Sequence, residues 1–177
     1  ANTAEIPLGW KSAWSKTDFA KNIVKFDEIL SGGPPKDGIP SIDEPKFELI
    51  SDIENIADTE PVVGVVINGK AKAYPLRVLT WHEIVNDKLG GVPITVTYCP
   101  SCNSSIVFDR RLDGKVLDLG TTGKLRNSDL VMYDRQTESW WQRFLGKGII
   151  GVMSEKLLKM LPSQLESFAS FKKCAPD

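Results

Sequence analysis

Two of the three cysteines, Cys99 and Cys102, are separated only by a proline and a serine, and this spacing can support chemistry. A Cys-x-x-Cys pair on a tight turn can present two thiolates to a metal ion. The same spacing forms a redox pair when its surroundings lower a thiol pKa. The third possibility is an inert local disulfide or two unreactive thiols. We favour metal or redox chemistry over an inert pair.

The only histidine, His82, lies upstream of the pair and is the third candidate ligand. Cys99, Cys102 and His82 would supply three ligands and leave one coordination position open. Two thiolates and one imidazole suit Cu(I), or zinc with a bound water. A soft or hard fourth ligand could come from Met132, Met153, Glu83 or Asp109. The competing interpretation of His82 is a core histidine hydrogen-bonded to a carbonyl, and the residues alone leave both open.

The redox alternative makes Cys99 a nucleophilic thiol that cycles with Cys102, with His82 as its acid–base partner. A thioredoxin-type site places a long helix after the motif. Here the chain continues through residues 105–109, which are mostly apolar and predict a strand. No β-α-β pattern precedes the motif. These flanks weaken the redox alternative, and whether the protein is an enzyme stays open.

Composition limits the partners that the protein can have. The 177 residues fit one domain with a sizeable core, and 41% of them are hydrophobic and 25% charged. The formal charge of −1 gives no indication of nucleic acid binding, and no apolar run is long enough for a transmembrane helix. The chain starts at Ala1, as expected for an exported protein without its signal or for a trimmed chain. We expect a periplasmic or extracellular location.

The elements that must position the cysteines are mostly strands. Residues 94–98 and 105–109 predict two strands, so the thiols should lie on a tight connection between them. Asn68-Gly69 predicts another hairpin. In a helix over 75–83, Leu76, Leu79 and His82 share one face, which should direct His82 inward. We predict two further helices, over 51–57 with a capping box and over 163–173.

These patterns predict an α+β fold: a single β-rich domain of mostly antiparallel hairpins with a few short helices. Residues 1–45 should form an N-terminal arm with a Gly/Pro-rich loop packed on the body, although a flexible leader is an alternative. Residues 46–177 should form the β-rich domain that carries the site.

Charged side chains are dense between residues 124 and 141. They could bind an anion or form a structural network, and we favour the network because charges on hairpins are usually structural or solvated. The residues concerned are Lys124, Arg126, Asp129, Asp134 and Arg135. Trp140 and Trp141 should point to opposite faces of a strand, so at most one should be in the core.

Four segments together resemble one family. They are Ser31-Gly-Gly-Pro-Pro-Lys-Asp-Gly-Ile-Pro40, Trp81-His-Glu-Ile-Val-Asn-Asp87, Thr97-Tyr-Cys-Pro-Ser-Cys-Asn103 and the run from Gly123 to Trp141. The family is an uncharacterised bacterial and archaeal one, domain of unknown function 3179, and the resemblance is nearly full-length. It implies export and implies that His82 and the Cys-Pro-x-Cys element belong to one signature. It carries no established activity to transfer.

Our first functional hypothesis is therefore an exported metal-binding protein for metal handling or transfer, with copper favoured and zinc possible. Cys99, Cys102 and His82 would be the ligands, and a metal-donor or metal-acceptor protein would be the partner. The alternative is a thiol–disulfide oxidoreductase or another thiol-dependent enzyme.

Overall fold

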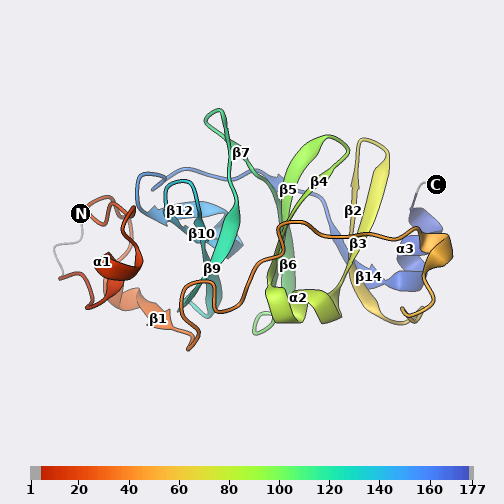
Figure 1. The fold of residues 1–177 in the computed structure, drawn as a ribbon, viewed down its shortest axis with the longest axis horizontal. Helices are drawn as coiled ribbons and strands as arrows, with labels where there is room; N and C mark the ends of the chain where they lie inside the picture. The colour runs from red at the N-terminus through yellow and green to blue at the C-terminus, as the bar shows by residue number, and fades with distance from the viewer. Residues whose placement is uncertain (1–4, 176–177) are drawn as a thin grey trace.

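The computed structural model describes residues 5–175 as an elongated molecule. Three antiparallel sheets follow one another along its long axis (Figure 1). This arrangement confirms the α+β, β-rich fold that the sequence predicts. The N-terminal arm lies at one end, α3 lies at the other, and the cysteine hairpin belongs to the middle sheet.

The first sheet has five strands in the order β1-β9-β10-β11-β12. Their bounds are β1 (Ile29–Ser31), β9 (Leu119–Arg126), β10 (Asp129–Asp134), β11 (Trp140–Gln142) and β12 (Lys147–Ile150). The turn between β9 and β10 consists of Asn127 and Ser128, both with positive φ. That turn brings the start of β10 next to the cysteine hairpin of the middle sheet.

The middle sheet has the order β13-β6-β5-β4, and the third sheet has the order β14-β2-β3. The middle strands are β4 (Ile84–Leu89), β5 (Val92–Cys99), β6 (Ser104–Asp109) and β13 (Met160–Leu161). The third sheet contains β2 (Pro61–Ile67), β3 (Lys70–Pro75) and β14 (Gln164–Ser167), and a small ribbon pairs β7 (Arg111–Leu112) with β8 (Lys115–Val116). The β2–β3 hairpin turns at Asn68-Gly69, as the sequence predicts.

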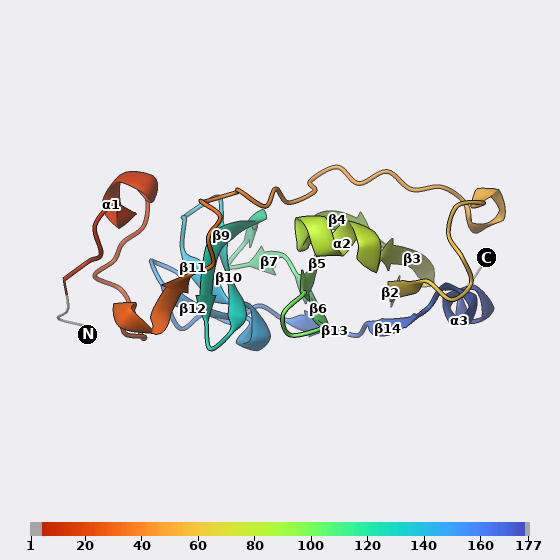
Figure 2. The same ribbon diagram turned by 90° about the horizontal axis from the view of Figure 1, so that it is seen from below.

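The helices are short. They are α1 (Trp10–Ala13), α2 (Leu76–His82) and α3 (Phe168–Cys174), with 3-10 turns η1 (Phe26–Glu28), η2 (Ile50–Asp52) and η3 (Arg143–Leu145). Within the described part of the chain, no helix has the length and apolar character needed to cross a membrane. Residues 32–60 run as an irregular strap along one side of the molecule (Figure 2).

One predicted helix is wrong, and another is confirmed only from Phe168 onward. The 51–57 segment forms only the single turn η2, and its capping box is not used. The predicted helix over 163–173 begins only at Phe168, because the preceding residues pair as β14 with the edge of β2. At residues 164–167, pairing with β2 overrides a weak local helix preference.

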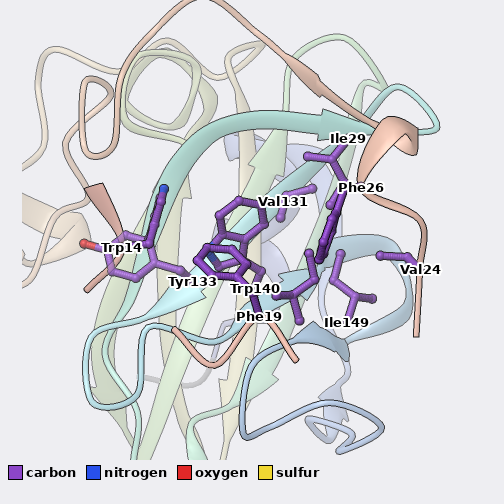
Figure 3. Packing of buried hydrophobic residues seen from close by; sticks show 10 residues of the cluster. Trp14, Phe19, Val24, Phe26, Ile29, Val131, Tyr133, Trp140 and Ile149 are labelled. Carbon is purple, nitrogen blue, oxygen red and sulfur yellow. The ribbon is translucent and has the colours of Figure 1, made fainter. Parts of the chain in front are cut away.

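The first sheet owes much of its core to the N-terminal arm (Figure 3). Trp14 and Phe19 pack edge-on against Trp140, with ring centroids 5.1 and 5.8 Å away. Trp141, on the other face of β11, is buried in a second cluster. The prediction that at most one of these tryptophans lies in the core is therefore wrong, because the arm covers the face that would otherwise be exposed.

Candidate thiol site

The cysteine pair lies in the loop that joins β5 to β6, as the alternating flanks predict. Cys99 is the last residue of β5 and pairs with Ser104, so four residues form the loop. The Cys102 amide donates to the Cys99 carbonyl over 3.2 Å, and Asn103 closes the turn with a φ of 45°. This turn brings the two Cα atoms within 5.3 Å, and the sulfur atoms form a disulfide.

The two sulfur atoms differ in exposure. Cys99 is buried, with 2% of its surface exposed, whereas Cys102 lies at the surface. The Ser101 hydroxyl lies 3.2 Å from the Cys99 sulfur. The Cys102 sulfur lies 3.3 Å from the Ser128 carbonyl oxygen and 3.9 Å from Oδ1 of Asp129. The β9–β10 turn therefore provides one wall around the more exposed sulfur.

Asp129 is the centre of a buried polar network behind the disulfide. Its Oδ1 accepts from Nε of Arg143 over 3.0 Å, and its Oδ2 accepts from Nε2 of Gln142 and from the Phe144 amide, both over 2.7 Å. Arg143 is fully buried, and its Nη2 donates to Oγ of Ser104 over 2.6 Å. The network thus joins η3, β10 and the first residue after the cysteine loop.

A small cavity of about 210 Å³ opens beside Cys99 and is also lined by Glu83 and Lys124. Glu83 follows the last residue of α2 and has a φ of 60°, a conformation that is strained for a residue with a side chain. Its carbonyl accepts from the Tyr98 amide over 2.8 Å, which fixes it next to the end of β5. Burial raises the pKa of the Glu83 carboxyl, and the positive charge of Arg143 opposes this shift.

Lys124 contributes to the same cavity, but its ammonium group faces the aromatic core. Nζ lies 5.3 Å from the Trp10 ring centroid and 5.9 Å from that of Trp140. Burial lowers the pKa of Lys124. The cavity is therefore lined by a glutamate that is protonated more easily than usual, and by a lysine whose ammonium group lies over two tryptophan rings.

The structure brings Cys99, Cys102 and Asp129 together, but not His82. The ligand atoms of those three residues all lie within 4.8 Å of one another, so they could hold a metal ion. No group of this kind among residues 5–175 includes His82. Nδ1 of His82 lies 2.8 Å from the Pro40 carbonyl oxygen, which fixes a proton on that nitrogen. This is the carbonyl-bonded arrangement that competed with the ligand hypothesis.

The other candidate ligands also have structural environments. Met132 and Met153 are buried in the apolar cluster around Trp141. Asp109 forms an ion pair with Arg111, with 2.6 Å between Oδ2 and Nη2. That ion pair lowers the Asp109 pKa, mainly through the hydrogen bond from Arg111.

The charges between residues 124 and 141 make separate contacts. Arg126 pairs with Glu28 over 2.6 Å, and Arg135 pairs with Asp43 over 2.9 Å. Asp134 accepts from Nε1 of Trp141 over 2.9 Å. The two ion pairs tie β9 and the loop after β10 to segments of the chain more than ninety residues earlier, and the Trp141–Asp134 hydrogen bond joins β10 to the neighbouring strand β11.

Sequence reasoning missed Arg143, Gln142 and Ser101. Ser101 lies between the two cysteines, so its spacing alone could have identified it. Arg143 offers no such signal, because it follows the tryptophan pair and reaches the site only through the order of strands in the first sheet.

A family model described as "Protein of unknown function (DUF3179)" matches residues 36–177. No curated protein and no solved structure matches the chain. The match covers all the residues of the thiol site described above.

Proposed function

The chain belongs to this DUF3179 family of unknown function, and we propose that it is a thiol–disulfide oxidoreductase whose redox pair is Cys99 and Cys102. The observation that carries the proposal is the disulfide itself, formed across a tight turn with one sulfur at the surface and the other beside a cavity.

The reaction would exchange two electrons and two protons with a partner. In the oxidising direction, a thiolate of the substrate attacks the Cys102 sulfur and releases Cys99 as a thiolate. A second substrate thiolate then resolves this mixed disulfide and releases Cys102. The products are a substrate disulfide and the Cys99/Cys102 dithiol. Because Cys99 is buried, Cys102 is the sulfur that a partner would reach first, which reverses the order expected from the sequence.

Glu83 is the side chain best placed to manage the proton on Cys99. It lines the same cavity as Cys99, and burial raises its pKa. A carboxyl that retains a proton at higher pH can donate it to the Cys99 thiolate as that sulfur leaves, and the carboxylate can take it back when the disulfide reforms. The Ser101 hydroxyl, 3.2 Å from the Cys99 sulfur, can also donate a hydrogen bond to a thiolate there.

Metal handling is the second candidate, and the grouping of two cysteine sulfurs with Asp129 favours it. In the dithiol state, the two thiolates would suit Cu(I), and the two thiolates with one oxygen would suit zinc; copper stays the favoured ion because thiolates are soft ligands. We rank it second because both Asp129 oxygens already accept hydrogen bonds, one of them from the buried cation Arg143. A ligand held in this way would have to exchange those donors for the metal.

We propose that the protein is exported, a location that fits both candidate functions. Disulfides persist mainly in oxidising compartments such as the periplasm, where a thiol–disulfide partner protein or a metal-donor protein would be met.

The test uses a Cys174→Ser background, because Cys174 is a free, exposed cysteine that would add to a thiol count. We expect no free thiol in the air-oxidised protein, two after reduction, and a reversible equilibrium with glutathione. We also expect Cys99→Ser to leave Cys102 reactive toward glutathione disulfide, and Cys102→Ser to leave Cys99 reacting at least about tenfold more slowly, because reaction rates follow exposure of the thiolate.

Elemental analysis of the same samples separates the two candidates. Near-stoichiometric copper or zinc in protein whose pair remains reduced under glutathione would overturn the redox proposal in favour of metal handling. A pair that oxidises and reduces reversibly with no bound metal would support it.

A further inference from the structure

A second and larger cavity, of about 650 Å³, lies between the strap, α2, α3 and the third sheet. Its floor is β3, its sides are formed by α2 and α3, and its roof is the part of the strap from residue 42 to residue 56. Figure 2 shows this strap passing along α2, β4 and β3 toward α3. None of the cysteines lines this cavity.

Among the described residues, the roof is hydrogen-bonded to the rest of the molecule near its two ends, to β4 at one and to α2 at the other, and Phe47 between them packs on Tyr74 of β3. At one end, Ile42 exchanges backbone hydrogen bonds with β4, where its amide donates to Ile84 and its carbonyl accepts from Asn86. At the other end, the Asn55 carbonyl accepts from Nη2 of Arg77 over 2.7 Å. Between these anchors, the described residues 44–54 make no backbone hydrogen bond to a sheet. Such a segment can move to admit a ligand without breaking a strand ladder.

Apolar side chains make up most of the cavity lining. Ala71, Ala73 and Leu79 line it from below and from the side, and Phe47 and Leu49 line it from the strap while remaining 40% and 72% exposed. Both side chains therefore keep solvent-exposed apolar surface on a strap that lines the cavity. This surface gains free energy when an apolar molecule covers it.

The polar side chains of β3 that line the cavity are already paired, so they present no free charge to an ion; the other charged residues of the lining, Glu44, Lys46 and Glu48, belong to the exposed strap. Nζ of Lys72 lies 2.9 Å from Oδ2 of Asp87, and the Tyr74 hydroxyl donates to the same oxygen over 2.6 Å. The Lys72 ammonium also lies 4.1 Å from the Phe47 ring centroid. A charged ligand would have to break this arrangement, whereas a neutral one would leave it intact.

The size of the cavity fits a small-molecule site. The cavity is open to solvent, unlike the small enclosed voids of close-packed protein interiors. A volume of about 650 Å³ lies within the range typical of small-molecule sites, which are mostly apolar with a few fixed polar groups. We propose that this cavity binds one neutral, hydrocarbon-rich small molecule, such as an acyl or isoprenoid chain.

The experiment measures binding of the neutral fluorescent probe N-phenyl-1-naphthylamine to the full chain. Ala71→Leu and Ala73→Leu, alone and together, fill the floor of the cavity, and Ala20→Leu makes the same chemical change at an exposed position in the N-terminal arm. We expect saturable binding at one probe per chain, at least about tenfold weaker in the filled variants and unchanged in Ala20→Leu. The anionic analogue 8-anilinonaphthalene-1-sulfonate should bind more weakly than the neutral probe.

A strap variant protects the test against a filled variant that fails to fold. Leu49→Ser removes an exposed side chain, so it should preserve folding and still weaken probe binding. No saturable binding by the unmodified protein, or equal binding by Leu49→Ser, Ala73→Leu and Ala20→Leu, would overturn the proposal. So would a concentration-dependent dimer that Ala73→Leu abolishes, because it would assign this face to a second copy of the chain.

Discussion

Replacing Asp129 with alanine should destabilise the protein strongly and loosen the cysteine loop at the same time. Asp129 is 5% exposed and its partner Arg143 is fully buried, so the substitution leaves a guanidinium in the interior without its counter-charge. The Gln142 side chain and the Phe144 amide lose an acceptor as well. Arg143 is also the residue that holds Ser104 at the base of the loop.

The expected size follows from those contacts. Breaking a buried ion pair by removing one partner typically costs about 3–5 kcal/mol, because the remaining charge has lost its compensation. With two further donors orphaned, we expect a loss of about 4 kcal/mol in the free energy of unfolding, within that range. For a chain of this length the melting temperature should then fall by roughly 8–16 °C.

Urea unfolding followed by tryptophan fluorescence, with the disulfide intact, measures this loss. The matched control is Lys156→Ala, which breaks an ion pair with Asp113 whose two side chains are 49% and 51% exposed, and it should cost less than about 1 kcal/mol. A double variant, Asp129→Ala with Arg143→Met, should be more stable than Asp129→Ala alone, since it removes the uncompensated charge. If Asp129→Ala cost no more than Lys156→Ala, the buried network around Asp129 would not stabilise the protein.

Three other outcomes follow from single contacts. Trp141→Phe should cost about 1.5–3 kcal/mol more than Trp140→Phe in urea unfolding, because only the Trp141 indole donates to the Asp134 carboxylate and Nε1 of Trp140 has no partner; equal costs would contradict this. Glu83→Gln should remove a decline in stability with pH. Burial raises the pKa of Glu83 in the folded protein above its ordinary value of 4.5. The contribution of Glu83 to the free energy of unfolding is therefore fully present below pH 4.5 and is lost as the pH rises through the folded pKa. A Glu83→Gln stability profile parallel to that of the unmodified protein between pH 4 and 8 would contradict this. Gly123→Ala should cost at least about 1 kcal/mol, since φ is +70° and a β-carbon would collide with a proline carbonyl of the N-terminal loop; a melting temperature unchanged in calorimetry would count against it.

The sequence predicts an element correctly where the residues that specify it are close together in the chain. The Asn68-Gly69 turn and the cysteine turn are specified by residues next to each other, so the hairpins there are predicted correctly. The segment 164–167 has an amphipathic helical pattern but forms a strand, because an unpaired edge of β2 lies beside it. Trp141 packs in a separate cluster, but burial of Trp140 as well depends on an arm more than a hundred residues earlier in the chain, which no local periodicity reveals.

The difference between a local pattern and the folded structure also decides which residue at the end of α2 lies beside the thiol site. Helical spacing predicts that His82 shares the buried face with Leu79, and as the only histidine it is the third candidate ligand. The helix ends at His82, however, and the next residue turns with a positive φ. That turn leaves His82 bonded to the strap at Pro40 and places Glu83 in the cavity beside Cys99. An imidazole in that position would have favoured a metal, whereas a buried carboxyl with a raised pKa favours proton transfer to sulfur. The positions of His82 and Glu83 relative to Cys99 thus follow from the positive φ of the residue that follows a seven-residue helix.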